Sequence, residues 1–495
     1  MNEQVPGDDD IVQEVAPGTP PTEPPLQETP EIGPPMEPVR EPERIHALDV
    51  LRGFAIFGIF MVNIAFFSMP IATVLDPTSL ANESSSDQFW HALMRALFEV
   101  KFITLFSILF GMGLVVQMQR AEKRGRPFVG LYLRRTFVLM ALGLIHALGL
   151  WYGDILFVYS FVAIVALLLR KLQPRSLVLL GGGFFALSVL ATVGLMAISV
   201  ISFAHLEKVE AAKSVSVTDQ TEVREEADVA GESEDLAELV LIEDPQERWD
   251  HFTSLIRFET FQPGNDVWVE VDIIAYTQGP MTATLIARAA TFVVMLLFIT
   301  VSFFGFRVLA TFLFGMALMK LDFFNRTNRR WHMLALVIGL IVGLPGELFL
   351  VWSYSHSDYN FGWLQGGAEI FHTTSSICLT FGYIGALTLL VHAGALRWFT
   401  YALSCVGRTA LSNYLLQTMV ATYIMYWWGL GFFNEVNRPQ QFAIVVMIYL
   451  CQLILSVLYL RVFRIGPFEW LWRSLTYLKL QPLLRQKGSI PPTVG

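Results

Sequence analysis

The sequence predicts an all-α polytopic membrane protein with about ten transmembrane helices. Hydrophobic residues make up 54% of the 495-residue chain and charged residues only 16%, against roughly 25% in typical soluble domains. Apolar runs of about 18 residues or more recur along it, each long enough to cross a hydrocarbon core of ~30 Å. These runs are continuous rather than alternating, which excludes a transmembrane β-barrel.

Acidic residues are concentrated in two segments outside the apolar runs. Residues 1–43 carry eleven acidic groups and one basic group, and residues 204–282 carry nineteen acidic and five basic groups. The whole chain has a formal net charge of −9, so the remainder is basic, at +15. A basic membrane body is typical of proteins whose short cytoplasmic loops are rich in Lys and Arg.

Composition divides the chain into five regions. The first is rich in Pro, Glu and Asp and poor in aromatic residues, so we expect a disordered cytoplasmic tail. Within the third region, residues 207–247 are expected to be mobile, and the aromatic stretch 248–282 predicts amphipathic helices on the membrane surface. The regions are a tail at 1–43, an N-terminal membrane half at 44–203, a periplasmic loop at 204–287, a C-terminal membrane half at 288–465 and a cytoplasmic tail at 466–495.

Ten apolar runs are candidate spans. Basic residues cluster in alternate connections between them, which by the positive-inside rule places both termini in the cytoplasm. The first run begins near residue 50, which predicts an uncleaved signal anchor. The run 288–319 is interrupted at Gly305-Phe306-Arg307, so one kinked span and a span with a re-entrant piece both stay open. The ten runs are 50–68, 100–119, 135–152, 154–170, 177–203, 288–319, 333–351, 367–394, 408–428 and 440–462.

The first candidate span carries a polar stripe. Asp49 and Arg52 lie about one helical turn apart near its start, and Asn63 follows further along. An arginine in a membrane helix is costly unless it faces protein or water, which favours a buried polar site. The alternative is an interfacial arginine whose side chain reaches the water, with Asp49 capping the helix.

A second constellation joins the third and fourth candidate spans. A tight turn at Tyr152-Gly153 would fold the two spans together, with Asp154 at the turn and His146 about one turn deeper. An Asp that orients a His makes a general base able to deprotonate a hydroxyl or an amine. The alternative is a buried structural His that donates to a backbone carbonyl.

Other polar residues lie inside or beside the spans. Lys101 enters the second span beside Glu99, while the ionisable residues Glu347, Glu369 and His372 are scattered in the C-terminal half. Further on, Arg408 and Asn413 lie close on one helical face, where they would hold a phosphate or serve as interhelical hydrogen-bonding groups.

Several kinds of site have no signature in the sequence. No Walker loop, GxGxxG turn, GxSxG elbow or His/Cys metal spacing occurs, so we expect no metal. The three cysteines, Cys378, Cys405 and Cys451, fall inside predicted spans and form no disulfide framework. No internal repeat is visible.

Several ordered motifs resemble the YeiB-like family of bacterial inner-membrane proteins, whose C-terminal half is catalogued as a domain of unknown function. The likeness covers about residues 44–480. It implies a multi-pass protein of the inner membrane. The matching motifs are Leu48-Asp49-Val-Leu-Arg52-Gly53 through Asn63, Lys101-Phe through Gly111, His146 through Asp154, Val406-Gly407-Arg408 through Gln417 and Gly466-Pro467-Phe-Glu469 through Arg473.

More distantly, the chain is similar to the transmembrane acyltransferase group. In the glycan-modifying branch of that group an Arg is followed, after ten intervening residues, by a His. Here Arg52 stands at the first position and Asn63 at the second, and Asn cannot act as a base. If the chemistry is shared, we expect His146 with Asp154 to replace the missing His.

The resemblance therefore implies an acyltransferase that moves an acyl group from cytoplasmic acyl-CoA to a periplasmic hydroxyl or amine. The expected partners are membrane lipid and a small-molecule or glycan acceptor, with no nucleic acid, and a homo-oligomer stays open. A transporter of a small metabolite or lipid and a non-catalytic scaffold are the alternatives. The expected roles are His146 as base with Asp154, Asn63 at the oxyanion, and acyl-CoA binding by Arg52, Asp49, Lys101, Arg408 and Asn413.

Overall fold

Every regular element in the described part of the chain is a helix, which confirms the all-α prediction. The computed structural model describes residues 44–75, 79–80, 83–216, 266–301, 304–357 and 363–485, so the expectations for 1–43 and 207–247 fall wholly or mainly outside it. The helices are α1 (His46–Ser68), α2 (Ile71–Leu75), α3 (Ser85–Leu97), α4 (Lys101–Lys123), α5 (Val129–Gly149), α6 (Leu156–Leu168), α7 (Pro174–Ser216), α10 (Asp266–Thr277), α11 (Met281–Val301), α12 (Phe304–Lys320), η4 (Arg326–Asn328), α13 (Arg329–Ile338), η5 (Gly339–Gly343), α14 (Leu344–His356), α15 (Trp363–Ala393), α16 (Arg397–Arg408), α17 (Ala410–Met425), α18 (Arg438–Val462) and α19 (Pro467–Tyr477).

The described helices include seven that are long and apolar enough to cross a membrane. Two shorter apolar helices, Leu156–Leu168 and Met281–Leu297, accompany them. A polytopic membrane protein is therefore confirmed in outline. The seven are His46–Ser68, Ser85–Lys123 (α3 and α4 together), Val129–Gly149, Pro174–Gly194, Arg326–His356 (η4 to α14 together), Trp363–Ala393 and Arg438–Val462.

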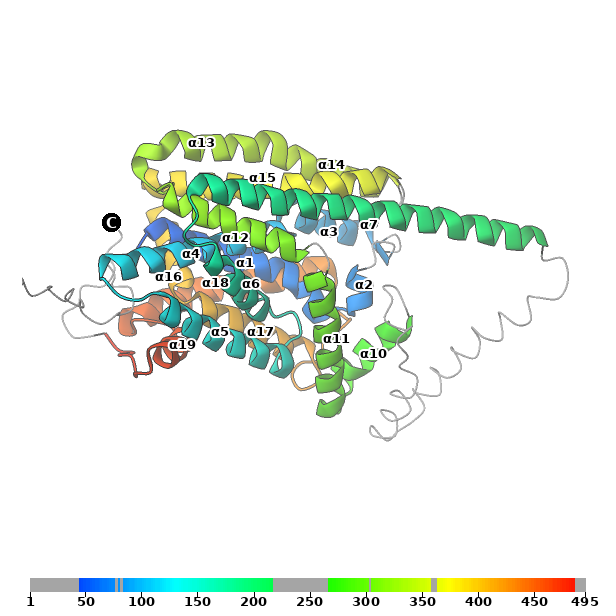
Figure 1. The fold of residues 1–495 in the computed structure, drawn as a ribbon. Helices are drawn as coiled ribbons and strands as arrows, with labels where there is room; N and C mark the ends of the chain where they lie inside the picture. Colours follow the sequence, from blue (N-terminus) through cyan, green and yellow to red (C-terminus); the bar gives the residue numbers. More distant parts are fainter. Residues whose placement is uncertain are drawn as a thin grey trace, which may run out of the picture.

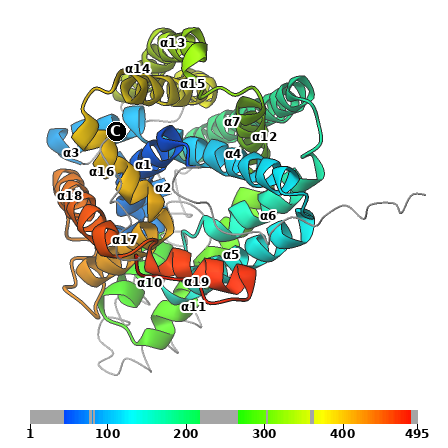
Figure 2. The same ribbon diagram turned by 90° about the vertical axis from the view of Figure 1, so that its left-hand side faces the viewer.

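Most of the long helices run roughly along one common axis, with α1 in the middle (Figures 1 and 2). Helices α4, α15, α16, α17 and α18 all pack against α1. The bundle has two ends, which we name by the helices that lie there. The α19 end holds α19 and the start of α1, and the α10 end holds α2, α10 and α11 (Figure 1).

Glycines allow two pairs of helices to approach closely. A Cβ on Gly111 of α4 would lie 2.0 Å from the carbonyl oxygen of Phe312 in α12, and one on Gly315 would lie 2.0 Å from that of Ile108. Only the absence of a side chain permits this backbone contact. Gly53 of α1 makes the same kind of contact with α16. Gly111 and Gly315 therefore let α4 and α12 pack closely.

The expected run 288–319 is not one continuous helix. It forms two helices, α11 and α12, and α11 crosses the bundle axis steeply whereas α12 runs along it (Figure 1). The helix that contains the expected span 177–203 is longer than the span, because α7 runs from Pro174 to Ser216. Of the predicted amphipathic helices in 248–282, the described part is α10 and the start of α11. In α10, residues Trp268, Val271 and Ile274 are buried in the apolar cluster at the α10 end of the bundle.

Candidate functional site

A cavity of about 260 Å³ opens at the α19 end, between α1, α4, α5, the α16–α17 junction and α19. Arginines dominate its polar lining, whereas Phe106, Leu109 and Leu156 belong to its apolar lining. Because arginine side chains supply many hydrogen-bond donors there, we call it the donor cavity. Its six arginines are Arg44, Arg52, Arg120, Arg135, Arg408 and Arg473.

The donor cavity has two acidic residues, Asp49 and Glu469. Asp49 accepts from Arg44 Nη1 at 3.0 Å and from Arg52 Nη1 at 3.1 Å, so it orients these two arginines and offsets one charge. Glu469 accepts from the backbone N–H groups of Leu411 and Ser412 at 2.7 and 3.2 Å. It thereby caps the positive N-terminal end of α17. Six guanidinium groups against two carboxylates leave the lining cationic.

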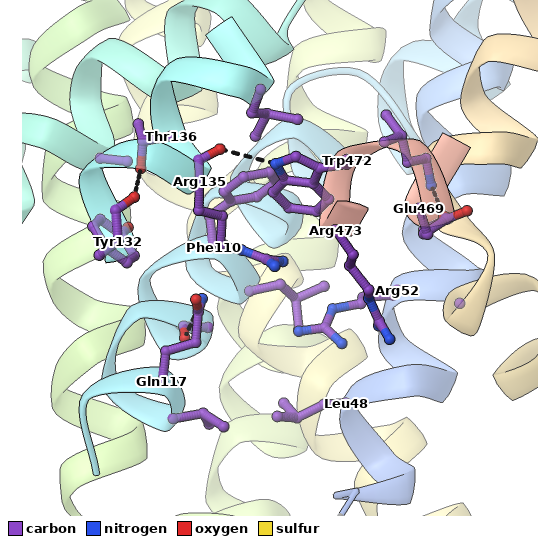
Figure 3. A pocket seen from close by; sticks show the side chains of 18 of the residues that line it. Leu48, Arg52, Phe110, Gln117, Tyr132, Arg135, Thr136, Glu469, Trp472 and Arg473 are labelled. Atoms are coloured by element: carbon purple, nitrogen blue, oxygen red, sulfur yellow. Dashed lines mark hydrogen bonds between the residues drawn. The ribbon is translucent and has the colours of Figure 1, made fainter. Parts of the chain in front are cut away.

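Figure 3 shows the Arg52 and Arg473 side chains, from α1 and α19, extending into the same space. Burial and the nearby Arg44 and Arg135 lower the pKa of Arg473 to about 9. A guanidinium still carries its charge at neutral pH. These charges repel one another, and a bound anion would relieve the repulsion. Arg135 is held by the Trp472 ring, whose centroid lies 3.6 Å from its Cζ.

The His146–Asp154 pair forms as the sequence indicated. His146 Nδ1 lies 2.8 Å from Asp154 Oδ2, and both residues are buried, with His146 1% exposed. Asp154 Oδ1 also accepts from the Phe157 N–H at 2.7 Å, which holds the start of α6. A Cβ on Gly143 would lie 2.7 Å from Asp154 Oδ1, so glycine lets α5 and α6 approach closely here.

Two residues of α17 contact His146, and one of them, Tyr414, also lines the donor cavity. His146 Nε2 lies 2.9 Å from the Thr418 hydroxyl, and the His146 ring lies 5.1 Å from that of Tyr414. Tyr414 and Leu156 also line the donor cavity. The Tyr414 side chain therefore contacts both the arginine-rich space and the buried histidine.

Three of the predicted site residues lie elsewhere. Lys101 is fully buried and pairs with Glu347, Nζ to Oε2 at 2.5 Å, so it lies outside the lining of the donor cavity, and its role in acyl-CoA binding stays a prediction. Asn413 donates to Thr409 and to Ser456 of α18, which is the interhelical alternative. Asn63 is half-buried on α1 outside the cavity lining, and its oxyanion role stays a prediction.

Lys101 belongs to a separate buried cluster of charges. Its partner Glu347 also lies 2.9 Å from His372 Nδ1 and accepts from Ser375 at 2.8 Å. The Lys101 ammonium donates to the backbone carbonyl of Arg95, and the Arg95 side chain pairs with Glu369. Residues that looked isolated in the sequence thus come together between α3, α4, α14 and α15. We call them the Lys101 cluster.

Sequence reasoning missed much of the donor cavity. The roles of Arg44, Arg120 and Arg135 had no local signal, since an arginine at a helix end is also typical of cytoplasmic loops. One signal was present in α19, where Glu469, Trp472 and Arg473 are spaced three and four residues apart and so share a helical face. Thr418 had no signal, because only the packing of α17 against α5 brings it to His146.

No group of three or more His, Cys, Asp or Glu side chains among the described residues is arranged to hold a metal ion. The fold and these sites define a polytopic α-helical membrane protein with an arginine-lined cavity at the α19 end, a buried His146–Asp154 pair and the buried Lys101 cluster.

A family described as "Protein of unknown function (DUF418)" matches residues 318–479. The chain is 32% identical to the uncharacterized protein YxaH of Bacillus subtilis, over 91% of this chain and 98% of the relative. It is 29% identical to the uncharacterized protein YeiB of Escherichia coli, over 89% and 98% of the two chains. The chain therefore belongs to the YeiB-like family. No solved structure matches it.

Proposed function

We propose that this protein is an inner-membrane acyltransferase that uses cytoplasmic acyl-CoA. In this proposal the chain crosses the membrane ten times, with the α19 end in the cytoplasm. Connections rich in Lys and Arg support that orientation, because those at 120–135, 170–175 and 320–330 follow or precede helix ends on one side of the bundle. The likeness to the acyltransferase group stays a prediction.

One observation carries the proposal: the arginine-rich donor cavity reaches Tyr414, which contacts the buried His146. An acyl-CoA presents phosphates at one end and a thioester at the other. Arginines bind phosphate through paired, charge-assisted hydrogen bonds. The cavity and the histidine would thus hold the two ends of one molecule.

The size of the donor cavity limits how much of the donor it can hold. Its volume of about 260 Å³ is smaller than that of most ligand pockets, roughly 300–1,000 Å³. The acyl group and the pantetheine arm would lie inside, against Phe106 and Leu156. The diphosphate would meet Arg52 and Arg473, and the nucleotide would remain at the cytoplasmic mouth.

The pair of His146 and Asp154 would act as base. In the neutral tautomer whose Nδ1–H donates to the Asp154 carboxylate, His146 Nε2 is an acceptor that faces the Thr418 hydroxyl. An acceptor hydroxyl or amine in the place of that hydroxyl would give its proton to Nε2 as its oxygen or nitrogen bonds to the thioester carbon. When the C–S bond breaks, the imidazolium returns the proton to the thiolate. The products are an ester or amide and free CoA.

The test is thiol release from acetyl-CoA by purified protein supplied with a cell-envelope extract as the source of acceptor. Wild-type protein should release thiol. His146→Ala should bind acetyl-CoA as before but release at least about a hundredfold less, since a general base contributes roughly 10²–10⁴. Equal release by the two proteins would contradict the proposal.

The Lys101 cluster favours transport as the second candidate. Ionisable groups buried within membrane helices commonly form ion or proton pathways. Here Lys101, Glu347 and His372 are linked in one chain of contacts between 2.5 and 2.9 Å. Proton-coupled flux into proteoliposomes that is abolished by Glu347→Gln and unaffected by His146→Ala would favour this candidate.

A further inference from the structure

Six buried polar atoms at the α10 end have no hydrogen-bond partner in the part of the chain that the structure describes. They belong to five side chains, each no more than 1% exposed. Native proteins pair nearly all buried polar atoms, so a group of unpaired ones points to a partner that the chain itself does not supply. The atoms are Asp272 Oδ1, Tyr276 Oη, Arg288 Nε, Arg288 Nη2, Thr291 Oγ1 and Tyr426 Oη.

Four of these side chains come together from three helices. The rings of Tyr276 in α10 and Tyr426, just after α17, stack with centroids 4.5 Å apart. Arg288 of α11 lies within hydrogen-bonding reach of the Tyr276 hydroxyl and close enough to interact electrostatically with the Tyr426 hydroxyl. Thr291 follows Arg288 by three residues and so lies on the same face of α11. We call Tyr276, Arg288, Thr291 and Tyr426 the Arg288 cluster.

The unpaired atoms of the Arg288 cluster can all donate. Nε and Nη2 of Arg288 form one edge of the guanidinium, the edge that binds two oxygens of a carboxylate or phosphate in parallel. Three hydroxyls add three more donors. A group with several oxygen lone pairs and negative charge satisfies such a set, whereas a cation or an apolar group does not.

Two tryptophans lie beside the Arg288 cluster. Trp427 covers α10, because its N–H donates to the Tyr276 carbonyl at 2.9 Å and its indole N–H to Thr284 at 3.1 Å. The Trp428 ring lies 5.7 Å from Arg288 Cζ. The cluster is therefore enclosed by aromatic rings, which suits a single charged group rather than a whole large ligand.

Arg288 also connects the cluster to the helix that carries His146. Its Nη1 donates to the carbonyls of Gly149 and Leu148 at 2.6 and 3.3 Å, at the C-terminal end of α5. His146 lies in the last turn of that helix. The cluster thus lies beyond His146, toward the α10 end, whereas the donor cavity approaches the same histidine from the α19 end.

We propose that the Arg288 cluster binds one oxyanion, a phosphate or carboxylate group, of a ligand that enters from the α10 end. The next step rests on the proposed function: the oxyanion belongs to the acyl acceptor, which is therefore anionic. Arg288 then serves as a positioning residue, since it holds both the anion and the end of α5. The anion is the charged group of a lipid headgroup or of a soluble acceptor.

Calorimetric titration of the purified full-length protein in uncharged detergent tests this, with inorganic phosphate and with acetate as probes. Phosphate also fits the donor cavity, so Arg52→Gln protein is titrated alongside to remove that component. Tyr276→Phe and Tyr426→Phe keep the ring stack and remove only the hydroxyls. Each should weaken the remaining binding about tenfold or more, as the loss of a hydrogen bond to a charged group does. Tyr423→Phe, at an exposed tyrosine of α17, is the matched control.

A second arm identifies the source of the anion. Thermal unfolding in nanodiscs of phosphatidylcholine alone is compared with nanodiscs containing phosphatidylglycerol. Stabilisation by phosphatidylglycerol without binding of the free probes assigns a lipid headgroup, and binding of the free probes assigns a soluble acceptor. Thr291→Val, nearly isosteric, gives the same test if the Phe variants do not purify.

Two results would overturn the proposal. One is unchanged binding in the variants of the cluster, and the other is a wild-type protein that responds to none of the probes. Asp272→Asn adds a check on the sign of the ligand, because removing a nearby carboxyl should tighten binding of an anion and weaken binding of a cation. CoA binding at the donor cavity should be unchanged in every variant of the cluster, so failure here and failure of the proposed function are distinct.

Discussion

Replacement of Asp154 by Asn should abolish the base without dismantling the fold. Asp154 accepts two hydrogen bonds, from His146 Nδ1 at 2.8 Å and from the Phe157 N–H at 2.7 Å. Asn has one oxygen, which can still accept from Phe157, while its NH₂ group faces Nδ1. The ring proton of His146 must then move to Nε2, and the base is lost.

The two substitutions available at this position separate catalysis from stability. Asp154→Asn should lower thiol release about 10²–10⁴-fold, the usual contribution of a general base. Its effect on the free energy of unfolding should be below about 1 kcal/mol, because both bonds of Asp154 can be replaced. Asp154→Ala leaves the Phe157 N–H and His146 Nδ1 without a partner and should cost about 2–4 kcal/mol.

The assay is thiol release from acetyl-CoA with envelope extract, read beside thermal unfolding of the same preparations. Wild-type turnover by folded Asp154→Asn protein would refute the assignment of His146 as base. A structural role for the pair would instead give a loss of activity that follows the loss of stability across the two variants.

Three further predictions concern packing, charge and pH. Gly111→Ala places a Cβ 2.0 Å from the Phe312 carbonyl oxygen and should destabilise the protein by about 1–3 kcal/mol, whereas Gly113→Ala, whose Cβ would meet nothing nearer than 4.0 Å, should not. Lys101→Met leaves the Glu347 carboxylate buried without its cation and should cost about 3–5 kcal/mol, most of which Glu347→Gln in the same chain should restore. Burial raises the pKa of Asp272 to about 7 from its ordinary value of 3.8, so stability should fall by up to about 4 kcal/mol as pH rises from about 4 to about 7, and Asp272→Asn should not show this fall.

Each of these has a clear contrary result in thermal or denaturant unfolding. Equal stability of the two glycine variants would mean that α4 and α12 do not meet as closely as described. A double variant no better than Lys101→Met would mean that the cost lies in lost packing rather than in an unpaired charge. If wild type and Asp272→Asn show the same slope of stability against pH, Asp272 is not the source of that slope. The wild-type slope is expected to be negative because the unfolded chain releases the Asp272 proton at lower pH than the folded chain does.

The parts of the fold that follow from local sequence were predictable. Length and hydropathy are enough to identify membrane helices, since hydrocarbon demands about twenty apolar residues in a row. The pairing of His146 with Asp154 was also within reach, because the turn at Tyr152-Gly153 brings two adjacent helices together. Such contacts depend on residues close in sequence.

Contacts between distant helices were not predictable in the same way. Arg473 and Arg52 are separated by most of the chain, and only the return of α19 to the start of α1 brings them into one cavity. The pairing of Lys101 with Glu347 was not predictable for the same reason, because the two residues are far apart in sequence and the charge of Lys101 alone fitted a phosphate site as well. The change of direction between α11, which crosses the bundle axis, and α12, which runs along it, depends on packing at the α10 end rather than on hydropathy.

Binding of acyl-CoA in the cavity at the α19 end can be measured by thermal unfolding of the detergent-solubilised protein. Acetyl-CoA, longer acyl-CoAs and free CoA are added to the wild type, to Arg52→Ala and Arg473→Gln, and to Arg461→Gln as a control for an exposed charge. Acyl-CoA binding at this cavity predicts stabilisation of the wild type and of Arg461→Gln that the two cavity variants lose. Folded wild-type protein that responds to no CoA species would contradict it and direct the search for function to transport through the Lys101 cluster.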